Sequence, residues 1–257
     1  MLLIAALQGI ALLYLKSAHE SGFWPGASPL WSFPLWTLAL ALPVLLLLSI
    51  ERDNSSRLLP PTGAFVVLLV LVAVYTGYQA RPFGEFPLGM LVFVFTVSIG
   101  LACFKALMYI QQRAAGVPMS YDVLFTYSWR NTLTLGLALL LTGVFWLILQ
   151  LWGELFSAIG IGFFKELFAM DWFLIPLLAI AHGVGIIVFR DLTRVIDSIT
   201  RLLQGLIKLL LPLAMTVAVL FVASLPFTGI DALWSTGHGT ALLLWLLAIV
   251  LFFVNAV

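Results

Sequence analysis

Eight long apolar stretches constrain the fold of this 257-residue chain more than any other feature. They cover residues 1–15, 31–50, 59–80, 88–111, 131–152, 172–189, 206–226 and 240–257. All but the first contain at least 18 residues, the length at which an apolar stretch predicts a helix that crosses the bilayer. The first ends at Lys16 and lacks the basic start and cleavage site of a signal peptide, so we interpret it as an uncleaved span. The stretches predict an all-α, polytopic transmembrane helical bundle with about eight spans.

The composition supports a membrane protein and excludes several other classes. Apolar residues make up 63% of the chain and charged residues 9%, whereas a soluble domain carries about 25% charged residues. The 12 basic and 11 acidic residues nearly cancel, which excludes the basic face of a nucleic-acid binder and the charge-rich composition of a disordered chain. The single cysteine, Cys103, excludes a disulfide framework. We therefore expect one transmembrane domain over residues 1–257, with short loops.

Basic residues are distributed unevenly among the predicted loops. Eight of the 12 Lys and Arg residues are assigned to the second, fourth and sixth loops, counting Lys208 at the start of the span that follows the sixth loop. Three fall in the odd-numbered loops, and Lys105 lies deeper within a span. Cytoplasmic loops carry an excess of Lys and Arg. The even-numbered loops and both termini are therefore predicted to face the cytoplasm.

Two segments, residues 153–170 and 190–205, are predicted to be amphipathic helices at the membrane interface. In the first segment, six apolar side chains would face lipid: Leu155, Phe156, Ile159, Phe163, Leu167 and Phe168. In the second, polar residues recur at steps of three and four along one face of a continuous helix that extends to Lys208: Arg190, Arg194, Asp197, Arg201, Gln204 and Lys208. Such a face is typical of a helix on the cytoplasmic surface whose Arg stems extend to phosphates. It also suits a contact with an anionic lipid headgroup or a cytoplasmic protein partner.

Two ionisable residues lie well inside predicted spans, His182 near the middle of 172–189 and Lys105 towards the end of 88–111. An ionisable group at membrane depth is a functional hypothesis by default, so both are candidates for lining a ligand or ion path. Each residue also has a purely structural interpretation. The predicted spans contain no Asp or Glu, which favours a neutral His182 bonded to a Ser, a Thr or a carbonyl of a neighbouring helix. The long stem of Lys105 can carry its ammonium to the inner headgroups.

Sequence patterns of common catalytic and cofactor sites are absent. The chain contains no H-E-x-x-H, G-x-S-x-G, G-x-x-x-x-G-K-[ST] or G-x-G-x-x-G pattern. Its three histidines are scattered, so we assign no metal site, no catalytic residue and no cofactor. The odd-numbered loops hold five carboxylates that a membrane-embedded enzyme would need to bring together: Glu20, Glu85, Glu154, Asp171 and Asp231.

Several segments carry a family resemblance. They are residues 189–208 (FRDLTRVIDSITRLLQGLIK), 225–229 (LPFTG), 236–240 (TGHGT), 128–131 (SWRN) and 75–77 (YTG). On these segments the chain resembles domain of unknown function 4153, a family of polytopic inner-membrane proteins of bacteria. The resemblance implies a bacterial inner (plasma) membrane location but no activity and no site residues. Members of that family continue past the position of Val257, so the resemblance implies that the chain is an amino-terminal fragment.

Three functions are compatible with these features. The first is a non-enzymatic scaffold, sensor or regulatory component that acts through the basic helix. The second is a transporter or channel subunit with His182 and Lys105 near its path, and the third is an enzyme that uses the outer-loop carboxylates. We favour the first because catalytic patterns and internal repeats are absent from the sequence. Its expected partners are membrane lipids with anionic headgroups and a protein on the cytoplasmic side, and not nucleic acid.

Overall fold

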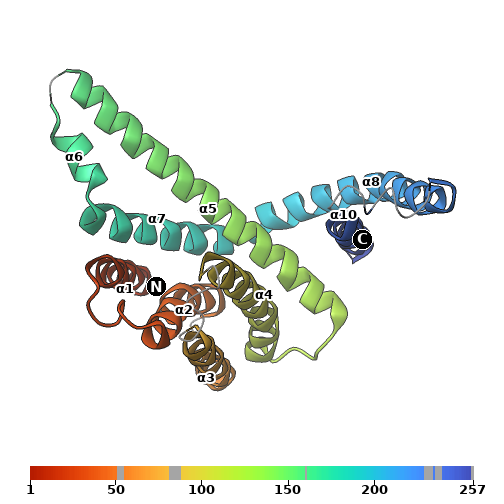
Figure 1. The fold of residues 1–257 in the computed structure, drawn as a ribbon, viewed down its shortest axis with the longest axis horizontal. Helices are drawn as coiled ribbons and strands as arrows, with labels where there is room; N and C mark the ends of the chain where they lie inside the picture. The colour runs from red at the N-terminus through yellow and green to blue at the C-terminus, as the bar shows by residue number, and fades with distance from the viewer. Residues whose placement is uncertain (51–54, 81–87, 160, 229–233, 235–238, 256–257) are drawn as a thin grey trace. The chain divides into compact units, whose positions relative to one another are not determined.

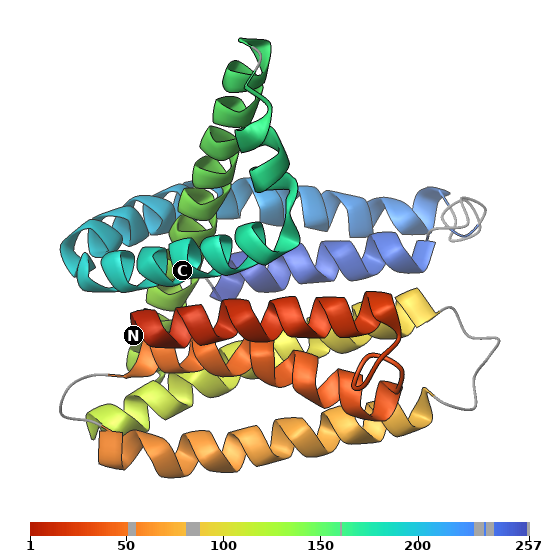
Figure 2. The same ribbon diagram turned by 90° about the vertical axis from the view of Figure 1, so that its left-hand side faces the viewer.

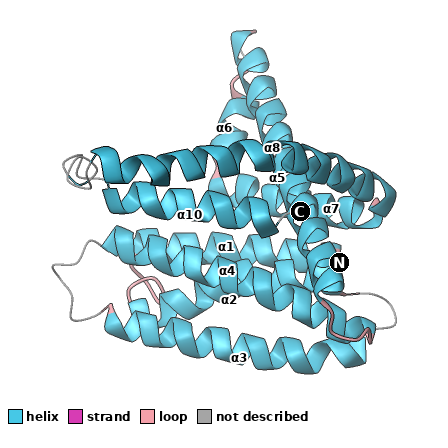
Figure 3. Cartoon of the chain, turned by 90° about the vertical axis from the view of Figure 1, so that its right-hand side faces the viewer, coloured by secondary structure: helices cyan, strands magenta, loops and turns pink. Residues whose placement is uncertain are grey.

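In the computed structural model the chain is built from helices, and the part of the chain that is described contains no strand (Figure 3). The structure describes residues 1–257 apart from 51–54, 81–87, 160, 229–233, 235–238 and 256–257. The chain divides into two compact units, Met1–Thr193 and Arg194–Val257. The prediction of an all-α polytopic helical bundle is confirmed.

The first unit holds seven helices within its described residues (Figure 1). They are α1 (Leu2–Ser21), α2 (Pro29–Ser49), α3 (Ser55–Gln79), α4 (Leu88–Ala115), α5 (Tyr121–Ala158), α6 (Phe163–Ala169) and α7 (Asp171–Asp191). All except α6 are long and apolar enough to cross a membrane. Local signals explain their ends. Gly22 adopts a left-handed φ of 67° after α1, Pro29 fills the first turn of α2, and the Ser120 hydroxyl accepts a hydrogen bond from the backbone N–H of Val123 at the start of α5.

The second unit contains α8 (Thr193–Thr228), which begins at the last residue of the first unit, and α10 (Gly239–Asn255). Helix α8 rises about 54 Å over its 36 residues, and its apolar part is long enough to span. Helix α10 has 17 residues and rises about 26 Å, short of the roughly 30 Å hydrocarbon core. About eight spans were predicted. Among the described residues, seven helices reach spanning length and α10 is a shorter apolar helix.

The predicted continuous helix from Arg190 to Lys208 is interrupted. Helix α7 ends at Asp191, Leu192 leaves the helical conformation with φ −83° and ψ 47°, and α8 begins at Thr193. Arg190 therefore belongs to α7, whereas Arg201 and Lys208 belong to α8. After this break, the rest of the predicted surface segment and the predicted span 206–226 form one continuous helix, α8.

The predicted interfacial helix over residues 153–170 is also divided. Helix α5 runs on to Ala158, and α6 is a separate helix between α5 and α7 (Figure 1). Phe156 and Phe168 were expected to face lipid, but their rings lie 4.8 and 6.1 Å from the ring of Phe164. The reason is the close approach of α6, since a Cβ added at Gly153 would lie 3.3 Å from the Cα of Lys165.

Helices α1 and α7 run side by side in opposite directions (Figure 2). At one end of the pair, Lys16 of α1 is bonded to Asp171 of α7. In the middle, a Cβ added at Gly9 would lie 2.6 Å from the Cα of Pro176. Towards the other end, Gly183 packs against Ala5. Small residues allow this approach, which matters in lipid because helix association there depends on close packing.

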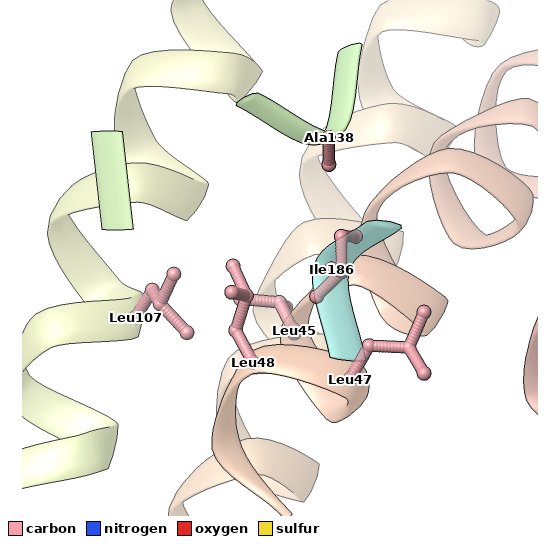
Figure 4. Close-up of a cluster of buried hydrophobic side chains, with 6 residues drawn as sticks. All are labelled: Leu45, Leu47, Leu48, Leu107, Ala138 and Ile186. Atoms are coloured by element: carbon pink, nitrogen blue, oxygen red, sulfur yellow. The ribbon is translucent and has the colours of Figure 1, made fainter. Parts of the chain in front are cut away.

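The core of the first unit lies where α2, α4, α5 and α7 meet. Six buried side chains form it (Figure 4): Leu45, Leu47, Leu48, Leu107, Ala138 and Ile186. Ala138 is fully buried because α7 approaches it closely at Gly185, where an added Cβ would lie 3.1 Å from the Ala138 Cβ. This cluster holds the helix ends that carry the polar contacts described next.

Candidate functional site

Arg190, at the end of α7, binds the end of α2. Its Nη1 donates hydrogen bonds to the carbonyl oxygens of Leu47 and Ile50, at 2.7 and 2.9 Å, and its side chain is 16% exposed. The last four carbonyls of a helix have no partner within the helix, and a cation near them also meets the negative end of the helix dipole. Arg190 therefore caps α2 from a neighbouring helix.

Gln111 of α4 and Asn131 of α5 form a reciprocal amide pair beside this cap. The Asn131 Nδ2 donates to Gln111 Oε1 at 2.7 Å, and the Gln111 Nε2 donates to Asn131 Oδ1 and to the Leu48 carbonyl, both at 3.1 Å. Arg130 Nη2 donates to the backbone carbonyl of Arg190 at 3.1 Å. We call these four side chains, Arg130, Asn131, Gln111 and Arg190, the helix-end network. It ties four helices together at one level.

The helix-end network also establishes how the helices alternate. It joins the C-terminal ends of α2, α4 and α7, while Lys16 and Asp171 join the end of α1 to the start of α7 on the opposite side. The C-terminal ends of α2, α4 and α7, which precede the second, fourth and sixth predicted loops, therefore lie on one side of the first unit. That this side is cytoplasmic stays a prediction from the charge bias.

His182 lies on α7 and faces α5. Its Nδ1 is 3.4 Å from the Oγ1 of Thr142, and the Thr142 hydroxyl donates its one proton to the Ala138 carbonyl at 2.7 Å. Because the single proton of this hydroxyl is directed to Ala138, the Thr142 oxygen can accept from the imidazole in the tautomer that carries its proton on Nδ1. The expected contact between His182 and a Thr of a neighbouring helix is therefore present.

Lys105 is exposed on α4, and His182 is half-buried on α7. Neither side chain is among the residues that line the cavity between α2 and α4. Their roles in a path stay predictions.

The basic face of the second unit is described only in part. Arg201 and Lys208 are exposed on α8 and are seven residues apart, so they lie two turns apart on one face. The side chains of Arg194 and Asp197 lie outside the described part of the chain. Arg190, which was predicted to share this face, instead caps α2.

The outer-loop carboxylates are engaged with lysines. Glu154 lies 2.9 Å from Lys165. The Lys16 Nζ lies 3.7 Å from the Oε1 of Glu20 and 2.5 Å from the Oδ2 of Asp171, so one lysine forms ion pairs with both carboxylates. Glu85 and Asp231 lie outside the described residues. The described part of the chain also contains no group of three or more His, Cys, Asp or Glu side chains that could hold a metal ion.

Sequence reasoning missed Gln111 and Asn131. A signal for them exists, because the two amides stand at facing edges of successive predicted spans, the last residue of 88–111 and the first of 131–152. An amide at such an edge can reach a neighbouring helix without crossing the hydrocarbon.

No family model, curated protein or solved structure matches the chain. The resemblance to domain of unknown function 4153 therefore stays a prediction. The length and hydropathy of the helices decide the broader class. The chain is an integral membrane protein.

Proposed function

We propose that this protein is a non-enzymatic scaffold, sensor or regulatory component of the bacterial inner membrane, and that the basic face of α8 is its working surface. One observation carries the proposal: the helix-end network uses the polar side chains of the first unit to join helices. Arg190, Asn131 and Gln111 all bond inside the bundle, and so does His182. Their placement favours a rigid support over a site that turns over a substrate.

The basic face of α8 provides the partner surface in this proposal. Arg201 and Lys208 are exposed on it, and Arg194 stands seven residues before Arg201 on the same helical face. A basic residue near an anionic leaflet contributes about 1 kcal/mol of attraction. We therefore assign to this face the anionic headgroups of the cytoplasmic leaflet, and beside them a cytoplasmic protein partner.

The transporter hypothesis has less support from the geometry. Neither of its two candidate residues, His182 and Lys105, lines the cavity between α2 and α4. That cavity has an apolar lining, which is unsuited to an ion. The enzyme hypothesis has less support for a related reason, because each described outer-loop carboxylate that contacts another charged group contacts a lysine.

A charge-matched pair of variants tests the proposed surface. The full chain is reconstituted in mixed phosphatidylcholine and phosphatidylglycerol vesicles, and the phosphatidylglycerol enriched around it is measured by native mass spectrometry. The double variant Arg194→Gln/Arg201→Gln is compared with Arg57→Gln/Arg113→Gln, which removes the same charge from exposed positions of the first unit.

We expect the α8 double variant to weaken phosphatidylglycerol enrichment by up to about 30-fold at low salt, the equivalent of roughly 2 kcal/mol. The first-unit double variant, which removes the same charge, should lose clearly less of the enrichment than the α8 variant. Unchanged enrichment in the α8 variant, or an equal loss in both, would reject α8 as the working surface.

A further inference from the structure

Between α2 and α4, the first unit contains an elongated cavity of about 740 Å³. Residues that line it run from Pro29 to Leu45 along α2 and from Gly89 to Leu107 along α4, about 24 and 27 Å of helix rise. Its deep end reaches the core, because Leu45 and Leu107 belong both to the cavity wall and to the buried cluster. The cavity is therefore long, and it follows the direction of two spanning helices.

The wall of this cavity is almost entirely hydrocarbon. Of its few polar side chains, Ser32 donates to the Pro25 carbonyl at 2.8 Å and Thr37 donates to the Phe33 carbonyl at 2.7 Å. Their hydroxyl protons are thus already engaged. A polar metabolite or an ion would lose hydration here without gaining partners, whereas an apolar chain would lose nothing.

The cavity carries its one imidazole at its shallow end and is accessible from the side. His19 and Gly26 line the shallow end, next to the exposed rings of Trp24 and Trp31, and such rings settle at the membrane–water interface. On the α4 side, the lining residues Val92, Thr96 and Gly100 are exposed, and α4 is the least buried of the seven spanning helices. A molecule in the bilayer can enter sideways, with its polar end at the level of His19.

These features match the polarity of one bilayer component. We propose that the cavity binds an acyl chain of a membrane phospholipid, with the headgroup at the His19 end and the chain directed towards Leu107. The polar end of the cavity corresponds to the headgroup of such a lipid, and its long apolar part corresponds to the acyl chain. Bulk lipid also offers hydrocarbon, so binding appears as retention of the lipid after detergent extraction.

Two glycines provide a filled-cavity variant and its control. A Cβ added at Gly100, which lines the cavity, meets no atom within 4 Å, so the ring of Gly100→Phe enters open space. A Cβ added at Gly143 of α5 also meets no atom within 4 Å, and Gly143 does not line the cavity. Both residues are exposed positions in spanning helices, so Gly143→Phe controls for a phenylalanine added to the lipid-facing surface.

The full chain is purified in detergent from vesicles that contain phosphatidylcholine with a photoreactive diazirine on its acyl chain. We expect wild type and Gly143→Phe to retain phospholipid and to carry adducts concentrated in residues 29–45 and 89–107. Gly100→Phe should lose at least about tenfold of this labelling, which corresponds to about 1.4 kcal/mol. Equal labelling of the two variants, or adducts spread evenly over all exposed helix faces, would overturn the proposal.

The unmodified chain offers a second readout, which does not depend on how the variants fold. Cys103 lines the cavity and is the one cysteine of the chain. We expect long-chain phosphatidylcholine, added to the detergent-purified protein, to slow the alkylation of Cys103 by N-ethylmaleimide. A rate that does not respond to phospholipid, or one that falls only as protein concentration rises, would overturn the proposal and indicate in the second case that another copy of the chain fills the cavity.

Discussion

Removing the guanidinium of Arg190 should destabilise the first unit more than the loss of any exposed basic residue. Arg190→Met keeps an apolar stem but removes the hydrogen bonds to the Leu47 and Ile50 carbonyls, at 2.7 and 2.9 Å. A hydrogen bond from a charged group contributes about 1.5–3 kcal/mol, so two such bonds give roughly 3–6 kcal/mol. The side chain is 16% exposed, so water replaces these bonds poorly. Arg190→Lys has one compact ammonium in place of the planar guanidinium, so it should retain about half of the stabilisation that the two hydrogen bonds provide.

The measurement is equilibrium unfolding of the full chain in mixed detergent and SDS micelles, followed by circular dichroism. Arg113→Met is the matched control, because Arg113 is exposed in the last turn of α4. Its free energy of unfolding should stay within about 0.5 kcal/mol of wild type. The reasoning is refuted if Arg190→Met also stays within that range, or if the control loses as much as Arg190→Met.

Three further changes probe the other contacts of the first unit in the same assay. Asn131→Leu should lower the free energy of unfolding by about 1–2 kcal/mol, because the Oε1 of its half-buried partner Gln111 loses its donor; no loss would contradict that pairing. Gly183→Leu should destabilise by about 1–3 kcal/mol through overlap with α1, while Gly143→Leu should stay close to wild type, and equal losses would reject the close approach. A double-mutant cycle on Lys16 and Asp171 should give a favourable coupling that shrinks as salt is raised, and a coupling insensitive to salt would exclude an ion pair open to water.

Hydropathy predicted most helices because a bilayer imposes a length requirement that acts along the sequence. The stretch 172–189 corresponds closely to α7 (Asp171–Asp191), and 88–111 lies within α4 (Leu88–Ala115). The ends were less predictable, as α5 shows. It begins well before residue 131 because Ser120 and Asp122 stabilise its first turn, and it continues past residue 152 because its last turns pack against α6.

The helix-end network was beyond the reach of a periodicity argument. Spacing tells which residues of one helix share a face, but it carries no information about which carbonyl of another helix lies opposite. The step of four from Arg190 to Arg194 therefore predicted one helix face. The break falls at Leu192, which is neither glycine nor proline and gives no local signal. Only the packing of α7 against α2 shows that Arg190 has carbonyl partners.

Arg190, His182 and Lys105 differ in role because of what stands beside them, although all three are ionisable residues in or at the end of a span. Arg190 meets carbonyls at the end of α2, which need donors, so it joins two helices. His182 meets Thr142, whose proton is directed to Ala138, so its ring is held in a contact between two helices. Lys105 lies on an exposed face of α4, where its stem can carry the charge towards headgroups. The position of an ionisable residue within a predicted span indicates that its side chain needs a polar partner. The partner that the fold provides then determines whether the residue stabilises the bundle or remains exposed to lipid.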